Sequence, residues 1–319
     1  MARMGNPLGS MPTTSAPPTP GRLALAVRAT RPLYLPTSVV PAVAGCLVAL
    51  GSDEARWWLA PVALLAVLLV HAGTDVINDV EDHARGVDTE EKMDNSRVFT
   101  TGLMSVSEGR RLGLGLFAAA AVLGVGICLV QGPALLPIGI AGILGGWAYT
   151  AGPRPLKFLG LGEVAIVPLM GPLLTQGAYT AVTGDGFSAA AFWIGMAPGL
   201  LIASVLEANN LSDIDGDARA GVRTLAVRLG FRRARVLYLV ALAGAYLTPV
   251  AVWAAGLFTW PVLLPLLTLP IAAARARQAL AADAPGDERL VTLAPQGAQL
   301  HLLFCVLLAA GIALAGGAA

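Results

Sequence analysis

The chain has 319 residues, of which 56% are hydrophobic and only 13% are charged. A soluble domain usually carries about 25% charged residues, so this composition cannot cover a water-facing surface and predicts a protein largely surrounded by lipid. The net charge of +1 excludes the strongly basic surface that nucleic-acid binding needs. The three cysteines, Cys46, Cys128 and Cys305, lie far apart in apolar runs. We predict that they are buried apolar side chains and not metal ligands.

The first residues of the chain differ from the rest in composition. Residues 1–21 are rich in Pro, Ser, Thr and Gly and contain no long apolar run. This pattern is typical of a disordered tail and not of a signal peptide. We therefore predict a disordered tail over residues 1–21 and a single transmembrane domain over residues 22–319.

Nine apolar segments are long enough to cross the hydrocarbon core of a bilayer, which takes about 20 residues of helix. They are 34–51, 57–79, 111–130, 133–150, 160–182, 187–211, 236–255, 258–274 and 296–316. The chain is therefore predicted to be an all-α, polytopic membrane protein with nine transmembrane helices.

The placement of basic residues predicts how these helices are oriented. The connections after the first, third, fifth and seventh spans are short, and Arg56 is the one basic residue in them. Every other Lys and Arg of the 21 in the chain lies in the N-terminal segment or in the even-numbered connections. By the positive-inside rule that side is cytoplasmic. We predict a multi-pass protein of the plasma membrane with a cytoplasmic N-terminus and an external C-terminus.

Two segments, residues 71–88 and 207–224, carry polar and acidic side chains out of the cytoplasmic end of an apolar span. Ionisable groups at membrane depth are costly and usually functional. Asn78 and Asp82 are four residues apart, as are Asp213 and Asp217. On a helix each pair shares one face, about 6 Å apart.

Such pairs favour a cation between them, because neighbouring carboxylates otherwise repel each other. Oxygen ligands without Cys or His suit Mg²⁺, which combines a few carboxylates with the phosphate oxygens of a substrate. Two acidic segments on one side of the membrane therefore predict a Mg²⁺-diphosphate site, where the metal neutralises a leaving group. The alternative is that the acids are ordinary solvated loop residues.

Cations near a diphosphate should be few. The candidates on the cytoplasmic side are Arg31, Arg97, Lys157 and Arg223. Arg suits bidentate contact with phosphate, whereas Lys acts as a point charge. Lys157 stands out because Lys92 is the only other lysine of the chain. Tyr149 precedes the connection that contains Lys157 and is predicted to face the same cavity.

At these positions the sequence resembles a known family. The first motif comprises Asn78, Asp79, Asp82, Gly86 and Asp88, with Arg97 and Gly102 downstream. Between the motifs lie residues 149–153 and 160–163, and the second motif comprises Asn209, Asn210, Asp213 and Asp217, with Gly221, Arg223, Thr224 and Leu225 after it. From Arg31 to about Gly230 the chain resembles the UbiA superfamily of intramembrane prenyltransferases. The nearest branch is that of the 1,4-dihydroxy-2-naphthoate prenyltransferases of menaquinone synthesis.

The resemblance implies helices around a central cavity with a cytoplasmic cap, and Mg²⁺-dependent transfer of a prenyl group from an allylic diphosphate to an aromatic acceptor. It implies metal ligands among Asn78, Asp79, Asp82, Asp88, Asp213 and Asp217. It implies a diphosphate bound by Arg31, Arg97, Lys157, Arg223, Asn210 and Tyr149, with Asp82, Asp213, Lys157 and Arg97 taking part in catalysis. The prenyl tail would extend toward lipid, since each buried CH₂ contributes about 0.8 kcal/mol. Nothing in the sequence calls for a protein partner.

The sequence departs from the family pattern at three positions. His71 stands where the family often has Gln, Asp75 where it often has Asn, and Val222 where it has Lys. These positions concern the acceptor more than the diphosphate, so a secondary-metabolite aromatic is an open alternative to a naphthoate. A membrane terpene cyclase that ionises the same diphosphate is a second alternative. A transporter would place its acids near the bilayer midplane, and a lipid phosphotransferase would need an Asp-Gly-x-x-Ala-Arg motif, which the sequence lacks.

Overall fold

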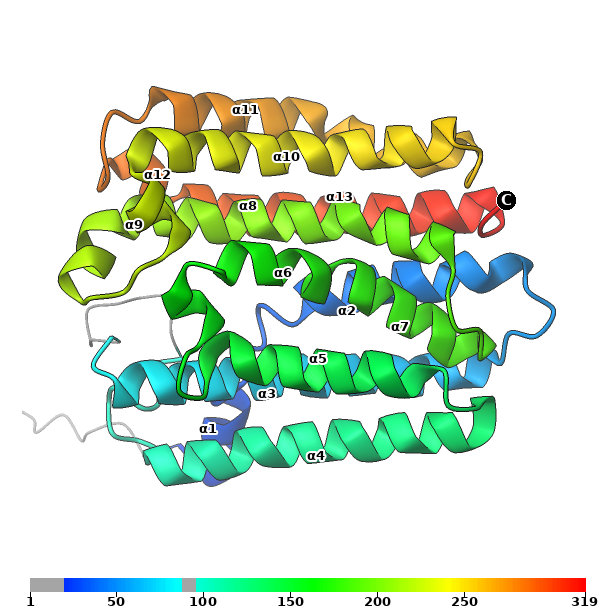
Figure 1. Cartoon of the computed structure of the whole chain (residues 1–319), viewed down its shortest axis with the longest axis horizontal. Helices are drawn as coiled ribbons and strands as arrows, with labels where there is room; N and C mark the ends of the chain where they lie inside the picture. Colours follow the sequence, from blue (N-terminus) through cyan, green and yellow to red (C-terminus); the bar gives the residue numbers. More distant parts are fainter. Residues whose placement is uncertain (1–19, 88–95) are drawn as a thin grey trace, which may run out of the picture.

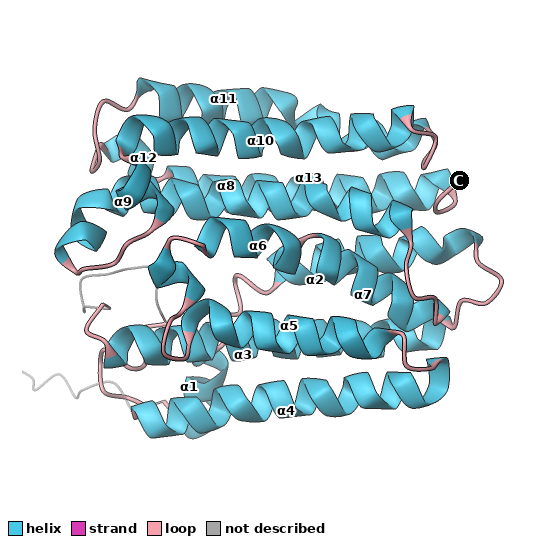
Figure 2. Ribbon diagram, in the orientation of Figure 1, coloured by secondary structure: helices cyan, strands magenta, loops and turns pink. Residues whose placement is uncertain are grey.

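The computed structural model describes residues 20–87 and 96–319, and in this part of the chain all regular structure is helical (Figure 2). The predicted tail over residues 1–21 therefore lies outside the described residues except for its last two positions. Asp88, a predicted metal ligand, also lies outside them. The α-helices are α1 (Arg22–Ala29), α2 (Pro36–Leu47), α3 (Ala60–Ala84), α4 (Val106–Gln131), α5 (Leu135–Thr150), α6 (Gly162–Met170), α7 (Pro172–Thr183), α8 (Ala189–Arg219), α9 (Leu225–Leu229), α10 (Phe231–Ala254), α11 (Leu269–Ala281), α12 (Glu288–Val291) and α13 (Leu293–Ala315). Short 3₁₀ segments are η1 (Val48–Gly51), η2 (Trp57–Leu59), η3 (Leu156–Leu159) and η4 (Trp260–Thr268).

The long helices run side by side along the longest axis of the molecule, and the short helices α1, α9 and α12 gather at one end (Figure 1). Among the described residues, five helical segments are long and apolar enough to cross a membrane: Trp57–Ala84, Val106–Gln131, Ala189–Arg219, Phe231–Ala254 and Glu288–Ala315. Shorter apolar helices cover Pro36–Gly51 and Leu135–Thr150. The chain is thus a multi-pass, all-helical membrane protein.

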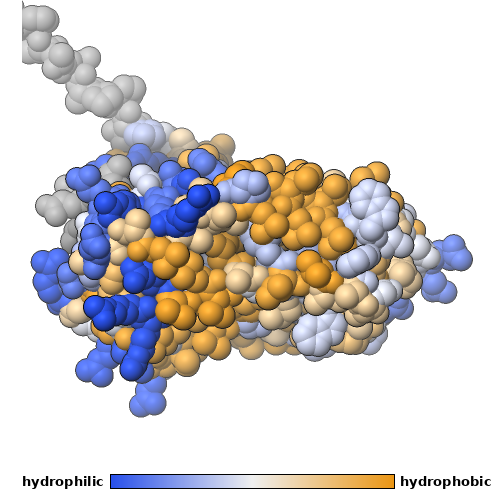
Figure 3. Space-filling view, turned by 90° about the horizontal axis from the view of Figure 1, so that it is seen from above, coloured by the Kyte–Doolittle hydropathy of each residue, from blue (hydrophilic) through white to orange (hydrophobic). Residues whose placement is uncertain are grey.

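The surface agrees with this assignment. On the face seen in Figure 3, hydrophilic residues gather at one end and hydrophobic residues cover most of the remaining length. Large apolar side chains of α4 point outward, including Val122 and Leu129, which is 83% exposed. Lipid is the solvent that accepts such a surface without cost.

Two helices extend beyond the C-terminal ends of the membrane spans that the sequence predicts. The apolar run 57–79 continues as α3 to Ala84, and the run 187–211 continues as α8 to Arg219. The two acidic segments therefore lie on the last turns of long helices, where side chains four residues apart share a face. This geometry makes α3 and α8 two rigid supports for the polar residues.

The predicted span 160–182 is divided at Gly171 into α6 and α7. A Cβ atom at Gly171 would lie 2.5 Å from the carbonyl oxygen of Gly195, and 2.9 Å from the Cα atom of Gly199 on α8. Small residues at such a contact let two helix backbones approach closely inside a membrane. The break and the close packing on α8 bring the N-terminal end of α6 to the polar end of the bundle.

Candidate active site

A cavity of about 640 Å³ lies among α2 to α8, within the size range of small-molecule sites. Its polar side chains come mainly from the end of the bundle that carries α9 and η3. They include Arg31, Asn78, Asp82, Tyr149, Lys157, Glu163, Asn209, Asn210, Asp213 and Asp217. The remaining lining is largely aliphatic, with Val67, Val125, Ile138, Leu173 and similar residues of α3 to α7. The cavity thus has a charged end and an apolar body.

Asn78 and Asp82 of α3 form one wall of the charged end, with Lys157 directly against them. The Lys157 ammonium donates to Asn78 Oδ1 at 2.6 Å and to Asp82 Oδ1 at 2.5 Å, and Thr150 Oγ1 donates to the same Asn78 oxygen at 2.9 Å. Lys157 also lies 4.9 Å from the centre of the Phe158 ring, a cation–π distance. These contacts hold a positive charge at a fixed place beside two oxygen ligands.

Asp213 and Asp217 of α8 line the same cavity, together with Asn209 and Asn210. Asn210 Nδ2 donates to Glu163 Oε1 of α6 at 2.5 Å. This contact joins the end of α8 to the start of α6. The two acidic segments, more than 120 residues apart in the sequence, therefore meet in one cavity, as the sequence predicts.

The structure does not bring every predicted site residue to the cavity wall. Asp79 is 1% exposed; its carboxylate pairs with Arg31 and accepts the Ser96 backbone N–H at 2.9 Å. These bonds tie α3 to the segments around Arg31 and Ser96. They give Asp79 a structural role, and its role as a metal ligand stays a prediction. Arg31 itself does line the cavity.

Arg97 and Arg223 also lie outside the residues that line the cavity. Arg97 has a backbone φ of +60°, in the left-handed region that non-glycine residues rarely adopt. Arg223 is exposed, while its neighbours Val222 and Thr224 face the cavity. The contacts of Arg97 and Arg223 with a diphosphate stay predictions.

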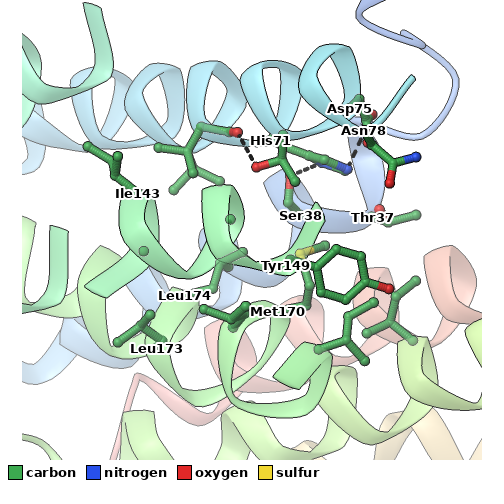
Figure 4. A pocket seen from close by; sticks show the side chains of 18 of the residues that line it. Thr37, Ser38, His71, Asp75, Asn78, Ile143, Tyr149, Met170, Leu173 and Leu174 are labelled. Atoms are coloured by element: carbon green, nitrogen blue, oxygen red, sulfur yellow. Dashed lines mark hydrogen bonds and ion pairs between the residues drawn. The ribbon is translucent and has the colours of Figure 1, made fainter. Parts of the chain in front are cut away.

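Sequence reasoning missed several polar residues of the site. Glu163 lies in one of the segments that resemble the family. Nothing in the spacing of the sequence indicates that Glu163 forms a hydrogen bond with Asn210. Ser38 lies in an apolar segment that reads only as a membrane span. Its Oγ lies 2.8 Å from His71 Nδ1, and His71 Nε2 lies 3.6 Å from Asp75 Oδ2 (Figure 4). His71 and Asp75 depart from the family pattern in the sequence, and the structure places them together on the cavity wall.

The donor set fits Mg²⁺ when the metal is held together with a phosphate ligand. Among the described residues, no three His, Cys, Asp or Glu side chains lie close enough to hold a metal by themselves. Two walls nevertheless present carboxylate and amide oxygens without sulfur ligands. Mg²⁺ is typically bound by one or two carboxylates, with substrate phosphates and water completing its octahedron.

The fold and the cavity define a class: a helical membrane protein whose internal cavity is charged at one end and apolar along its body. The sequence model described as "UbiA prenyltransferase family" matches residues 38–293. The chain belongs to this family, and it is an enzyme of the prenyltransferase class.

Named relatives are similar over most of the chain. A 1,4-dihydroxy-2-naphthoate octaprenyltransferase of Mycobacterium tuberculosis is 37% identical over 230 residues, which are 68% of this chain and 75% of that protein. The enzyme of the same name from Haemophilus influenzae is 31% identical over 258 residues, 79% of this chain and 82% of that protein. A solved UbiA homolog from Archaeoglobus fulgidus, bound to DMAPP and Mg²⁺, superposes with a TM-score of 0.66 at 19% identity, covering 91% of this chain and 99% of that one. At that identity the likeness concerns the fold.

Proposed function

We propose that this protein catalyses the Mg²⁺-dependent transfer of a prenyl group from an allylic prenyl diphosphate to an aromatic acceptor of the 1,4-dihydroxy-2-naphthoate type. The names of its relatives and the chemistry of the cavity support the same reaction. The product is a prenylated precursor of a quinone, and inorganic diphosphate leaves.

One observation carries the proposal: the two acid-bearing helix ends share one cavity whose body is apolar. Asn78 and Asp82 come from α3, and Asp213 and Asp217 from α8. A diphosphate carries several negative charges and needs cations or metal between it and such carboxylates. A prenyl chain needs an apolar channel, because each CH₂ removed from water contributes about 0.8 kcal/mol. No smaller or fully polar substrate would use both halves of this cavity.

In the proposed mechanism, bound Mg²⁺ supplies Lewis-acid neutralisation of the departing diphosphate. Asn78, Asp82, Asp213 and Asp217 would hold it. Lys157 stabilises the negative charge that develops on the leaving group, and its bonds to α3 place it before the substrate arrives, so that little reorganisation is needed.

The remaining chemistry depends on what the cavity excludes. Aliphatic residues of the cavity body keep water away from the allylic carbon, which protects a carbocation-like state from hydrolysis. The electron-rich ring of the acceptor attacks that carbon, and the ring then loses a proton or CO₂. No protein nucleophile is required for this sequence of steps.

We further propose that residues 22–319 form one domain of nine membrane-crossing helices in the plasma membrane, with the charged end of the cavity at the cytoplasmic face. The N-terminus is then inside and the C-terminus outside. The asymmetric placement of basic residues supports this orientation, and the family match over 38–293 falls within the proposed domain.

The direct test is to incubate the purified protein with Mg²⁺, allylic diphosphates of several lengths and a panel of aromatic acids, and to identify the products by mass spectrometry. A prenylated dihydroxynaphthoate, or the prenylated dihydroxynaphthalene left after loss of CO₂, supports the proposal. Cyclic hydrocarbon formed without any acceptor would instead identify a terpene cyclase and contradict it. A reaction omitting Mg²⁺ and a reaction omitting the acceptor are the matched controls.

A further inference from the structure

His71 and Asp75 form a polar patch on the cavity wall that the diphosphate chemistry does not use. Both lie on α3, on the face that also carries Asn78. His71 precedes Asn78 by seven residues, which at 1.5 Å per residue places it about 10 Å farther along the helix axis. His71 therefore lies where the apolar body of the cavity begins, and Asp75 lies between it and the charged end, next to Asn78 (Figure 4).

Ser38 holds the imidazole of His71 in place. Ser38 Oγ lies 2.8 Å from His71 Nδ1 and 3.1 Å from the Leu35 carbonyl oxygen. The contact with Nδ1 orients the ring so that Nε2 is turned toward Asp75.

His71 Nε2 lies 3.6 Å from Asp75 Oδ2, beyond hydrogen-bonding distance. This buried oxygen has no hydrogen-bond partner among the described residues. A buried acceptor without a donor costs about 1–3 kcal/mol. A ligand hydroxyl can donate to Oδ2 and also contact Nε2, because a hydroxyl is both a donor and an acceptor.

The surroundings indicate what kind of group carries that donor. Facing the patch are the apolar side chains of Ile143, Met170, Leu173 and Leu174 (Figure 4). These side chains offer a flat or chain-like ligand a hydrophobic surface and no hydrogen bond. The neighbouring Thr74 hydroxyl is committed to the Val70 carbonyl oxygen at 2.9 Å. A ligand that fits has an apolar, ring-sized body with a hydroxyl at its edge.

We propose that His71 Nε2 and Asp75 Oδ2 form the subsite that binds a phenolic hydroxyl of the aromatic acceptor, which donates its hydrogen to Asp75 and contacts His71. This inference rests on the proposed function and adds the residues that orient the acceptor. The hydroxyl is anchored at His71 and Asp75, and the opposite edge of the ring is directed toward the charged end, where the allylic carbon lies. Ser38 is a positioning residue, because it holds the ring of His71 in place.

The test compares acceptors and variants in one kinetic assay. The acceptors are a dihydroxynaphthoate and its analogues in which one hydroxyl at a time is replaced by hydrogen or by a methyl ether. The variants are His71→Leu, which removes the imidazole nitrogen that contacts the hydroxyl, and His71→Gln, which returns a polar atom that can hydrogen-bond there. Thr74→Val is the matched control on the same helix face. KM is measured separately for the acceptor and for the prenyl diphosphate.

We expect the wild-type protein to prefer the acceptor with both hydroxyls by at least about tenfold in kcat/KM over one of the analogues, the value of one good hydrogen bond. His71→Leu should raise the acceptor KM and abolish that preference, while the KM for the prenyl diphosphate is unchanged. His71→Gln should restore part of the preference, and Thr74→Val should keep all of it.

Two results would overturn the inference while leaving the proposed function intact: a wild-type protein that prenylates all the analogues equally well, or a His71→Leu variant with the discrimination of Thr74→Val. The first result needs no variant, so it holds even where a substitution prevents folding. A wild-type protein that forms no aromatic product from any acceptor would contradict the proposed function itself, and the inference with it.

Discussion

Lys157 Nζ lies 2.5 Å from Asp82 Oδ1, and the two side chains are only 15% and 11% exposed. The contact joins η3 to the end of α3 across 75 residues of sequence. A carboxylate beside the membrane interior is stable when a cation compensates its charge. The same pair places a positive charge at the polar end of an otherwise apolar cavity, where a leaving diphosphate would need it.

Replacing Lys157 by Met should lower kcat/KM for prenyl transfer by about 10²–10³-fold, because a preorganised electrostatic contact to the leaving group is lost. The substitution also removes the partner of the Asp82 carboxylate, so thermal unfolding in detergent is measured to show that the variant is folded. Steady-state kinetics with product detection by mass spectrometry measure the effect. Arg154→Met is the matched control, since Arg154 is exposed and lies three residues away. Equal activity of the two variants would contradict the role given to Lys157.

Asp82→Asn and Asp213→Asn should each remove most of the activity, because each substitution takes a negative charge from one of the two walls that hold the metal and the diphosphate. Asp215→Asn should behave like the wild type, since Asp215 is exposed on α8 and points away from the cavity lining. Turnover is measured at saturating Mg²⁺, and thermal unfolding in detergent shows whether each variant is folded. Full turnover in either cavity variant would exclude that residue from the metal site.

The apolar body of the cavity should determine which prenyl chain the enzyme prefers. Gly142 of α5 lines it, and nothing lies within 4 Å of a Cβ atom built there. Gly142→Phe should fill that space and shift the preference toward shorter allylic diphosphates. Gly115→Phe on the exposed side of α4 is the control. The measurement is the distribution of prenyl chain lengths among the products. An unchanged distribution in Gly142→Phe would show that the prenyl tail does not lie beside Gly142.

The close packing of α6 and α7 on α8 should depend on small residues. A Cβ atom at Gly195 would lie 2.8 Å from Pro172 Cα, so Gly195→Ala forces backbones apart and should cost roughly 1–3 kcal/mol of stability. Gly126→Ala, on the exposed side of α4 with nothing within 4 Å of the new Cβ atom, should change stability little. Thermal unfolding in detergent compares the two. A Gly195→Ala protein as stable as the control would show that the contact adapts.

Much of the fold and the charged end of the cavity follows from the sequence, because both depend on local patterns. Apolar runs predict helices wherever they are long, and pairs such as Asn78 with Asp82 share a helix face by their spacing alone. The meeting of these helices in one cavity is a hypothesis that two similar segments suggest, and Asp82 and Asp217 both line the cavity.

Other features depend on contacts between segments far apart, and sequence patterns do not contain them. Asp79 stands in the same motif as Asn78, yet its carboxylate turns to Arg31 and Ser96. The break at Gly171 depends on the glycines of α8 that lie against it. The pairing of Ser38 with His71 joins two apolar spans. In each case the partner, and not the residue itself, decides the role.

The most direct test of the central claim is a double-mutant cycle for binding of a non-reactive prenyl thiodiphosphate, measured by calorimetry with and without Mg²⁺. The wild type, Asp82→Asn, Asp213→Asn and the double variant are compared. If α3 and α8 hold one Mg²⁺-diphosphate together, each single variant should lose most of the Mg²⁺-dependent affinity, and the double variant should lose little more. The account would be contradicted if either single variant bound with the Mg²⁺-dependent affinity of the wild type. It would also be contradicted if the binding free energy lost in the double variant were the sum of the losses in the two single variants.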